Sequence, residues 1–190
     1  MIKHVYGIVA AAMATATTII LIGGCWWYDH HRRLTWNQVD VLIARDFPHV
    51  PQIDVHHLAV WLHDPLLKPP LLLDVRSRTE YAVSHLYHAH WIDTSEPISK
   101  AMASVSRTEP IVTYCSVGYR SSAYAQRLLQ NGFTNVHDLK GSIFQWADDG
   151  LPVYRHGRIV HHVHPYNRYW GQLLKRPLWA FSVSHSVASP

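Results

Sequence analysis

The sequence predicts an α/β fold in which a central, mostly parallel β-sheet is flanked by helices. Three observations support this prediction. Short apolar runs at residues 71–76, 111–114 and 135–139 have the length and composition of strands buried inside a sheet. Segments whose apolar residues recur at helical spacing separate these runs. Strands that alternate with helices in this way pair in parallel through crossover connections.

The run at 111–114 leads into a short polar loop and then into a helix, and this unit carries the candidate chemistry. Ser121 and Ser122 are expected to cap the helix, and Gly132 suits its end. A loop that enters the first turn of a helix can point its N–H groups inward. Together with the positive end of the helix dipole, these groups form a cradle for an anion.

Cys115 opens this loop and Arg120 closes it. A thiol in such a cradle is expected to ionise readily and to act as a nucleophile. Because a cation beside a helix N-terminus is disfavoured by about 0.3–1 kcal/mol, we expect the thiolate, its substrate or both to offset Arg120. The alternative is that Cys115 is a small buried hydrophobic residue. The four residues between Cys115 and Arg120 would supply the amides of the cradle: Ser116, Val117, Gly118 and Tyr119.

Two further strand-end residues, Asp74 and Arg76, are expected near Cys115. Ligands of parallel sheets bind beyond the carboxyl ends of the strands, where the runs at 71–76 and 111–114 both end. We interpret Asp74 and Arg76 as a buried ion pair that supports the neighbouring loop. Direct catalysis by this pair is the alternative.

Composition limits the kinds of partner. With 48% hydrophobic and 16% charged residues, the 190-residue chain has room for one compact domain and additional segments. The net charge of +4 comes from scattered Lys and Arg residues, so no basic stripe predicts a nucleic-acid partner, although small anions are favoured. Two cysteines in different contexts, Cys25 and Cys115, make a disulfide framework unexpected.

Residues 1–25 resemble a bacterial signal peptide. A short basic start precedes an apolar, uncharged run at 5–22, and residues 22–25 resemble a lipobox whose Cys25 would carry the lipid. The length of the run also fits an uncleaved membrane anchor, so both alternatives stay open. Either one predicts attachment to a membrane of the bacterial cell envelope, with the folded domain in the periplasm.

Residues 26–51 are expected to form a linker and a leading helix. A capping box at 35–38 opens this helix, which runs to about residue 46. The main domain is expected to span residues 52–153 and to begin with a short edge strand at 52–53. Asp54 then caps a helix that ends before Pro65.

Two further helices are expected before the loop. A second capping box at 77–80 opens a helix that buries Tyr81, Ala82 and Leu86. After a short strand within 88–92, a helix near Pro97 is expected to face inward at four positions: Ile98, Ala101, Met102 and Val105. After the last strand, residues 141–142 turn into a short helix.

Residues 154–190 form a basic, aromatic C-terminal extension that we expect to be an appendage, wrapping the domain. His161, His162 and His164 suggest a metal site, but no nearby cysteine or carboxylate completes a ligand set. We therefore interpret them as surface histidines and predict no metal.

Three blocks of sequence in the same order resemble the rhodanese family. The blocks lie at residues 71–86, 115–121 and 139–153. The first contains Asp74-Val75-Arg76, Glu80-Tyr81 and His85-Leu86, which resemble the Asp-Val-Arg and Glu-Tyr…Gly-His-Ile motifs of the family. The second resembles the active-site loop and the third the closing block. The resemblance covers residues 52–153.

This resemblance implies a single-domain sulfurtransferase that needs no cofactor. Cys115 would take a sulfane sulfur from a small anionic donor such as thiosulfate and hold it as a persulfide. Cyanide or a thiol, including a protein thiol, would accept it. The loop amides from Ser116 to Arg120 would hold the persulfide, and Arg120 would steer the donor.

Loop length and departures from the family pattern refine this expectation. The Cys-x4-Arg loop is associated with sulfur transfer in this superfamily, whereas Cys-x5-Arg belongs to phosphatases and arsenate reductases. Ser116 stands where thiosulfate-preferring members often have a second Arg. Ser84 and Ser142 replace common glycines, which we expect to alter turn flexibility more than chemistry. The alternatives are a non-catalytic sulfur carrier or binding module and, behind it, a cysteine-dependent phosphatase or arsenate reductase.

Overall fold

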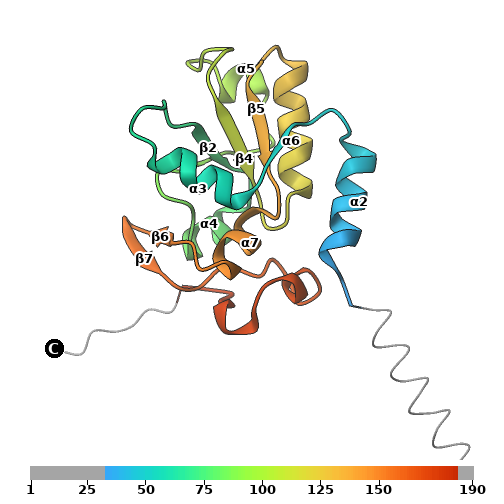
Figure 1. Cartoon of the computed structure of the whole chain (residues 1–190), viewed down its shortest axis with the longest axis vertical. Helices are drawn as coiled ribbons and strands as arrows, with labels where there is room; N and C mark the ends of the chain where they lie inside the picture. Colours follow the sequence, from blue (N-terminus) through green and yellow to red (C-terminus); the bar gives the residue numbers. More distant parts are fainter. Residues whose placement is uncertain (1–32, 184–190) are drawn as a thin grey trace, which may run out of the picture. The chain divides into compact units, whose positions relative to one another are not determined.

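The structure is a computed structural model that describes residues 33–183 (Figure 1). The predicted signal or anchor at 1–25, with Cys25, lies outside the described residues. Of the described residues, those from 34 to 183 belong to one compact unit. Within the described part of the chain, no helix combines the length and the apolar character needed to cross a membrane.

A five-stranded sheet forms the centre, and each of its strand pairs is parallel. In spatial order the strands are β1 (Gln52–Ile53), β5 (Val136–Leu139), β4 (Ile111–Tyr114), β2 (Leu71–Asp74) and β3 (His90–Trp91). All four residues of the central strand β4 are buried. The α/β prediction is therefore confirmed.

The register of the two central strands sets the position of the loop. Asp74 at the end of β2 pairs with Tyr114 at the end of β4. Cys115 follows directly, and the Val75 N–H donates to the Tyr114 carbonyl at 3.1 Å. Both strands therefore end at one edge, as expected for a parallel sheet.

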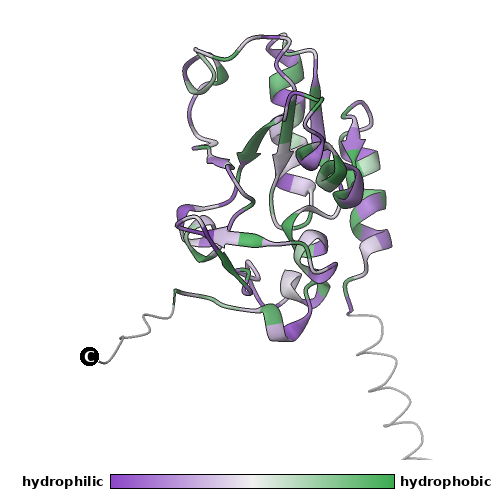
Figure 2. Cartoon of the chain, turned by 60° about the vertical axis from the view of Figure 1, so that its left-hand side comes forward, coloured by the Kyte–Doolittle hydropathy of each residue, from purple (hydrophilic) through white to green (hydrophobic). Residues whose placement is uncertain are grey.

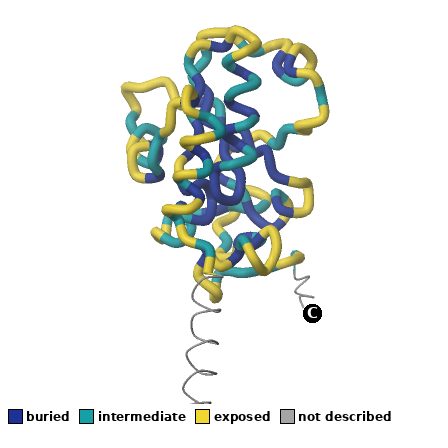
Figure 3. Tube along the Cα trace, turned by 90° about the vertical axis from the view of Figure 1, so that its right-hand side faces the viewer, coloured by how far each residue is buried: buried dark blue, intermediate teal, exposed yellow. Residues whose placement is uncertain are grey.

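Helices cover both faces of the sheet, so successive strand residues enter two different hydrophobic clusters (Figure 1). The helices are α2 (Trp36–Asp46), α3 (Val55–His63), α4 (Arg78–Val83), α5 (Ile98–Ala101), α6 (Tyr119–Gln130) and α7 (Ser142–Asp148). Leu72 packs in one cluster with residues of α2, α3 and α7, whereas Leu73 packs in the other with residues of α5 and α6. Figure 3 shows this buried interior along the tube.

Both predicted capping boxes are present. The Thr35 hydroxyl accepts from the Gln38 N–H, and the Gln38 side chain accepts from the Thr35 N–H at 2.9 Å. Ser77 and Glu80 make the same exchange at the start of α4. The Asp54 carboxylate likewise caps α3, so short-range sequence patterns locate these three helix starts correctly.

Two helices are shorter than expected. Helix α4 ends at Val83, because Ser84 adopts an extended backbone. Val83 is buried, whereas Ala82, which was predicted to face inward, is exposed. Helix α5 has a single turn that ends before Met102, so Val105 lies outside it. A tertiary contact decides where α4 ends, since the Ser84 carbonyl accepts a hydrogen bond from the buried Arg76.

Helix α6 begins earlier than predicted, and the proposed caps have other partners. Gly118 is the N-cap, with a φ of 109° that glycine adopts without strain. The Ser121 hydroxyl donates to the Gly118 carbonyl at 3.1 Å, and the Ser122 hydroxyl donates to Asp138 at 2.7 Å. The expectation that Ser121 and Ser122 cap the helix is therefore wrong.

The C-terminal segment packs onto the domain. It contains the antiparallel hairpin of β6 (Val153–Arg155) and β7 (Arg158–Val160), followed by two 3₁₀ turns, η1 (Trp170–Leu173) and η2 (Arg176–Leu178). Val163, Leu173 and Leu174 are buried in the same cluster as Trp146 of α7. In Figure 2 apolar residues alternate with polar ones along this lower segment. The hydrophobic core thus continues past the boundary expected at residue 153.

Candidate active site

Cys115 lies between β4 and α6 and lines a small pocket. Its residue exposure is 1%, and the Gly118 N–H donates to its Sγ at 3.2 Å. The pocket has a volume of about 170 Å³. Seven residues line it: Cys115, Ser116, Val117, Tyr119, Arg120, Tyr166 and Trp170. The structure therefore brings five of the six predicted loop residues to the pocket wall, and Gly118 contacts the sulfur through its amide.

The start of α7 holds the loop from the other side. The Ser142 hydroxyl accepts the Cys115 N–H at 2.9 Å, and the Ile143 and Phe144 amides donate to the carbonyls of Cys115 and Ser116. Ser142 has a φ of 52°, a left-handed conformation that is uncommon for serine. Besides the effect on turn flexibility expected from the sequence, the Ser142 hydroxyl thus fixes the backbone of the candidate nucleophile.

Glu80 is the anion that compensates Arg120. The Arg120 guanidinium donates two hydrogen bonds to the Glu80 carboxylate, at 2.7 and 3.0 Å, and a third to the Ser116 hydroxyl at 3.0 Å. Burial alone would raise the pKa of Glu80, but the hydrogen bonds and charge of Arg120, together with the Ser77 amide and the Arg76 charge, outweigh burial and hold the pKa at about 2. The sequence identified Glu80 as a capping residue, and the expected partners of Arg120 did not include it.

Asp74 and Arg76 form a buried ion pair next to the loop. The Arg76 Nη2 lies 2.6 Å from Asp74 Oδ2, and both side chains are fully inaccessible to solvent. Arg76 also donates to the Ser84 carbonyl, and its own carbonyl accepts from the Trp91 indole. Neither Asp74 nor Arg76 lines the Cys115 pocket. This arrangement fits a structural support that joins β2, α4 and β3.

A second buried carboxylate lies beneath the helix start. Asp138 of β5 is 0% exposed and accepts the Ser122 hydroxyl. Burial raises the pKa of Asp138 to about 7, against the lowering effect of its hydrogen bonds with Ser121, Ser122 and Gln52. Asp138 falls within the strand predicted at 135–139, and only the packing of β5 under α6 gives its carboxylate this environment.

Two pocket residues come from the C-terminal segment. Tyr166 and Trp170 line the pocket, and the Arg120 guanidinium lies 4.6 Å from the centre of the Tyr166 ring. No local pattern relates residues 166–170 to the loop at 115–120, so the sequence offered no signal for this contact.

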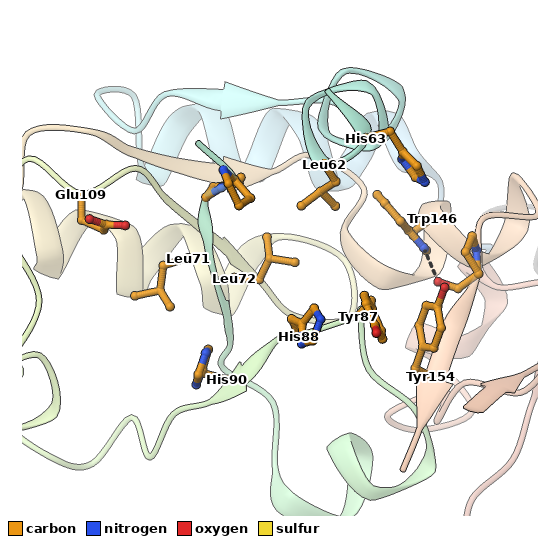
Figure 4. A pocket seen from close by; sticks show the side chains of 13 residues that line it. Leu62, His63, Leu71, Leu72, Tyr87, His88, His90, Glu109, Trp146 and Tyr154 are labelled. Carbon is orange, nitrogen blue, oxygen red and sulfur yellow. Dashed lines mark hydrogen bonds between the residues drawn. The ribbon is translucent and has the colours of Figure 1, made fainter. Parts of the chain in front are cut away.

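A larger cavity of about 500 Å³ lies elsewhere, beside the beginning of β2 (Figure 4). It is mainly apolar and includes Leu72, Trp146 and Tyr154 together with three histidines. It shares no lining residue with the Cys115 pocket. Throughout the described residues, no cluster of three or more His, Cys, Asp or Glu side chains is arranged to hold a metal. His161 and His162 are exposed.

Comparison with known proteins agrees with this geometry. A family model described as "Rhodanese-like domain" matches residues 58–149. Thiosulfate sulfurtransferase GlpE of Actinobacillus pleuropneumoniae serotype 5b is 34% identical over 82 residues, which cover 43% of this chain and 75% of GlpE. The chain belongs to the rhodanese-like family.

Other relatives share this domain within different proteins. The tRNA uridine(34) hydroxylase of Photorhabdus laumondii is 32% identical over 92 residues, and the match spans 44% of this chain and 26% of that enzyme. Among solved structures, BH2092 from Bacillus halodurans superposes with a TM-score of 0.50 at 21% identity, covering 64% of this chain and 87% of that one. A rhodanese-like domain protein from Staphylococcus aureus superposes with a TM-score of 0.49 at 24% identity. This match covers 56% of this chain and 98% of that one.

Proposed function

We propose that this chain is a sulfurtransferase in which Cys115 carries a sulfane sulfur as a persulfide. The observation that carries the proposal is the setting of the Cys115 sulfur: Cys115 lines a pocket, and the Gly118 amide donates to the sulfur. A donor N–H and a helix N-terminus both stabilise negative charge on sulfur. The similarity to GlpE, which is named a thiosulfate sulfurtransferase, supports the same reaction.

The proposed reaction has two balanced steps. The Cys115 thiolate attacks the outer sulfur of the donor, a new S–S bond forms, and the old bond breaks with its electron pair leaving on sulfite when thiosulfate is the donor. The persulfide anion then passes its terminal sulfur to cyanide, which leaves as thiocyanate, or to a thiolate, which becomes a persulfide. The thiolate of Cys115 is regenerated without any net oxidation.

The rigid loop suits this chemistry. The Cys115 amide and carbonyl and the Ser116 carbonyl are all bonded to the start of α7, so the loop is held before substrate binds. Four residues separate Cys115 from Arg120, which favours a cradle for one sulfur atom over the longer phosphatase loop. A sulfur carrier without turnover remains the second candidate, since the same persulfide could be delivered to a partner.

Mass spectrometry and turnover test the proposal together. We expect Cys115 to gain the mass of one sulfur atom after incubation with thiosulfate, an organic persulfide or an organic thiosulfonate. Cys115→Ser should retain the fold and lose transfer to cyanide. Persulfide formation without turnover would support the carrier. Undiminished turnover in Cys115→Ser, or hydrolysis of an aryl phosphate in its place, would refute the proposal.

We further propose that residues 1–25 attach the protein to a bacterial envelope membrane. The support is the apolar run at 5–22 followed by Gly23, Gly24 and Cys25. Lipidation predicts that Cys25→Ala blocks processing and acyl labelling. If the run is instead an uncleaved anchor, the variant stays membrane-bound at its full length.

A further inference from the structure

Two aromatic side chains from outside the matched family domain form one wall of the Cys115 pocket. We call Tyr166 and Trp170 the aromatic wall. With Val117 and Tyr119 they make four of the seven lining residues apolar or aromatic. The family match ends at residue 149, so the aromatic wall is a feature of this chain's own C-terminal segment.

The aromatic wall is held in place by buried anchors. Leu173 and Leu174 are 5% and 3% exposed within the main hydrophobic cluster. Gly171 packs so closely that a Cβ atom there would lie 2.6 Å from the Trp179 ring. The Asn167 side chain accepts the Trp170 N–H at 2.9 Å. These contacts fix the backbone that carries Trp170 beside the pocket.

The charges around the pocket disfavour a dianion. Among the described residues that line the pocket, Arg120 alone is cationic, and the Glu80 carboxylate already balances its charge. The Tyr166 ring lies against the same guanidinium. A donor must also approach the Cys115 thiolate, and aromatic ring faces carry partial negative charge. Thiosulfate, with two negative charges and no apolar part, gains little from such a surface.

We propose that Tyr166 and Trp170 determine donor specificity, favouring a singly charged sulfane-sulfur donor with an organic, ring-bearing body over thiosulfate. This inference rests on the proposed sulfurtransferase function. Organic thiosulfonates have the required chemistry. The Cys115 thiolate attacks their outer sulfur, a new S–S bond forms, and the donor's S–S bond breaks with its electron pair leaving on the sulfinate. The ring of the donor contacts the aromatic wall while the reaction proceeds.

The experiment compares three donors, with cyanide as the acceptor. Benzenethiosulfonate and methanethiosulfonate carry the same charge and differ in the ring, and thiosulfate carries the second charge. In Tyr166→Ala and in Trp170→Ala we expect the ratio of kcat/KM for benzenethiosulfonate to that for thiosulfate to fall about 3- to 10-fold. Intrinsic donor reactivity cancels, because each ratio is compared with that of the wild-type protein.

Two control variants make the test specific. Tyr166→Phe keeps the ring and should keep the wild-type ratio. Phe181→Ala removes an exposed ring of the same segment that does not line the pocket, and it should also leave the ratio unchanged. If Trp170→Ala does not fold, Tyr166→Ala decides alone, since Tyr166 is 44% exposed.

The outcomes separate the two proposals. An unchanged ratio in the alanine variants, with sulfur still loaded on Cys115, would overturn donor selection by the aromatic wall and leave the sulfurtransferase function standing. Failure of every donor to place sulfur on Cys115 in the wild-type protein would overturn the function and this inference with it.

Discussion

At the scale of single residues, the site depends on side chains that hold others in place. Ser142 accepts the amide of Cys115, and Glu80 binds both Arg120 and Ser116. Glu80 is 2% exposed, so its carboxylate has exchanged water for these partners. An ion pair with one buried member is sensitive to loss of the other, because the remaining charge cannot be fully solvated.

The Glu80 ion pair predicts a defined pH dependence. The folded-state pKa of about 2 lies below the ordinary value of 4.5, so its contribution is present above about pH 4.5 and is lost as the pH falls toward 2. We expect Glu80→Gln to lower the free energy of unfolding by about 3 kcal/mol at pH 7 and by progressively less below pH 4.5. Urea denaturation between pH 3 and pH 7 measures this difference.

Glu96→Gln is the matched control. Glu96 pairs with Lys100 on the surface, where the side chains are 36% and 72% exposed. Loss of this surface ion pair should lower the free energy of unfolding by no more than about 0.5 kcal/mol. Two results would contradict a stabilising ion pair between Glu80 and Arg120. One is an equal loss of unfolding free energy in the two variants, and the other is a loss in Glu80→Gln that stays the same down to low pH.

At the scale of elements, three helices fix one loop. Helix α6 begins at the loop, α7 binds its backbone, and α2 packs against it, since the Tyr119 hydroxyl donates to Asp46 at 3.0 Å. Gly118 lies where these elements meet. A Cβ atom there would lie 3.0 Å from the Ile43 side chain and 3.4 Å from Asp138. The leading helix predicted within 26–51 is thus part of the loop's support.

We predict that Gly118→Ala damages both stability and transfer. The φ of 109° strains any side chain, and we expect a loss of about 1–3 kcal/mol in the free energy of unfolding. Because the loop must also shift, sulfur transfer should fall by about 100-fold. Both quantities are measured on the same preparation.

Gly132→Ala separates strain from displacement. Gly132 has a φ of 85°, but an added Cβ there meets no atom within 4 Å. Gly132→Ala should lower the free energy of unfolding by a similar amount, because its backbone is strained too, and it should retain a near wild-type rate of sulfur transfer. Comparable activity loss in both variants would show that the crowding at Gly118 does not control the loop.

At the scale of the whole molecule, the C-terminal segment is integrated into the domain. Leu174 is 3% exposed in the same cluster as Leu86 and Trp146. The same segment delivers Tyr166 to the pocket. Residues beyond the family match therefore contribute both to the hydrophobic core and to the wall of the Cys115 pocket.

Leu174→Ala tests this integration. Loss of a buried leucine should lower the free energy of unfolding by about 2–5 kcal/mol within a single cooperative transition. Leu67→Ala, at a 52% exposed position, should change it by less than about 0.5 kcal/mol. Thermal and urea unfolding that leave the main transition of Leu174→Ala unchanged would mean that the segment folds independently of the domain.

The sequence by itself determined the fold class, the succession of the main strands and helices along the chain, and the loop from Cys115 to Arg120. Strands and capped helices follow from short-range patterns, and Cys115 and Arg120 flank the loop within six consecutive positions. Such local features depend on neighbours in the chain, so periodicity and motif spacing are enough to read them. Local patterns did not predict the early end of α4, because the hydrogen bond from Arg76 to the Ser84 carbonyl sets where that helix ends.

Only the tertiary structure decided what surrounds the sulfur. Glu80 lies 40 residues from Arg120 in sequence, Ser142 lies 27 from Cys115, and the aromatic wall lies farther along the chain still. These contacts form because sheet register and core packing bring distant segments together, and no local pattern encodes them. The candidate nucleophile Cys115 could therefore be predicted from the sequence, whereas the partner that balances the charge of Arg120 and the residues that complete the pocket could not.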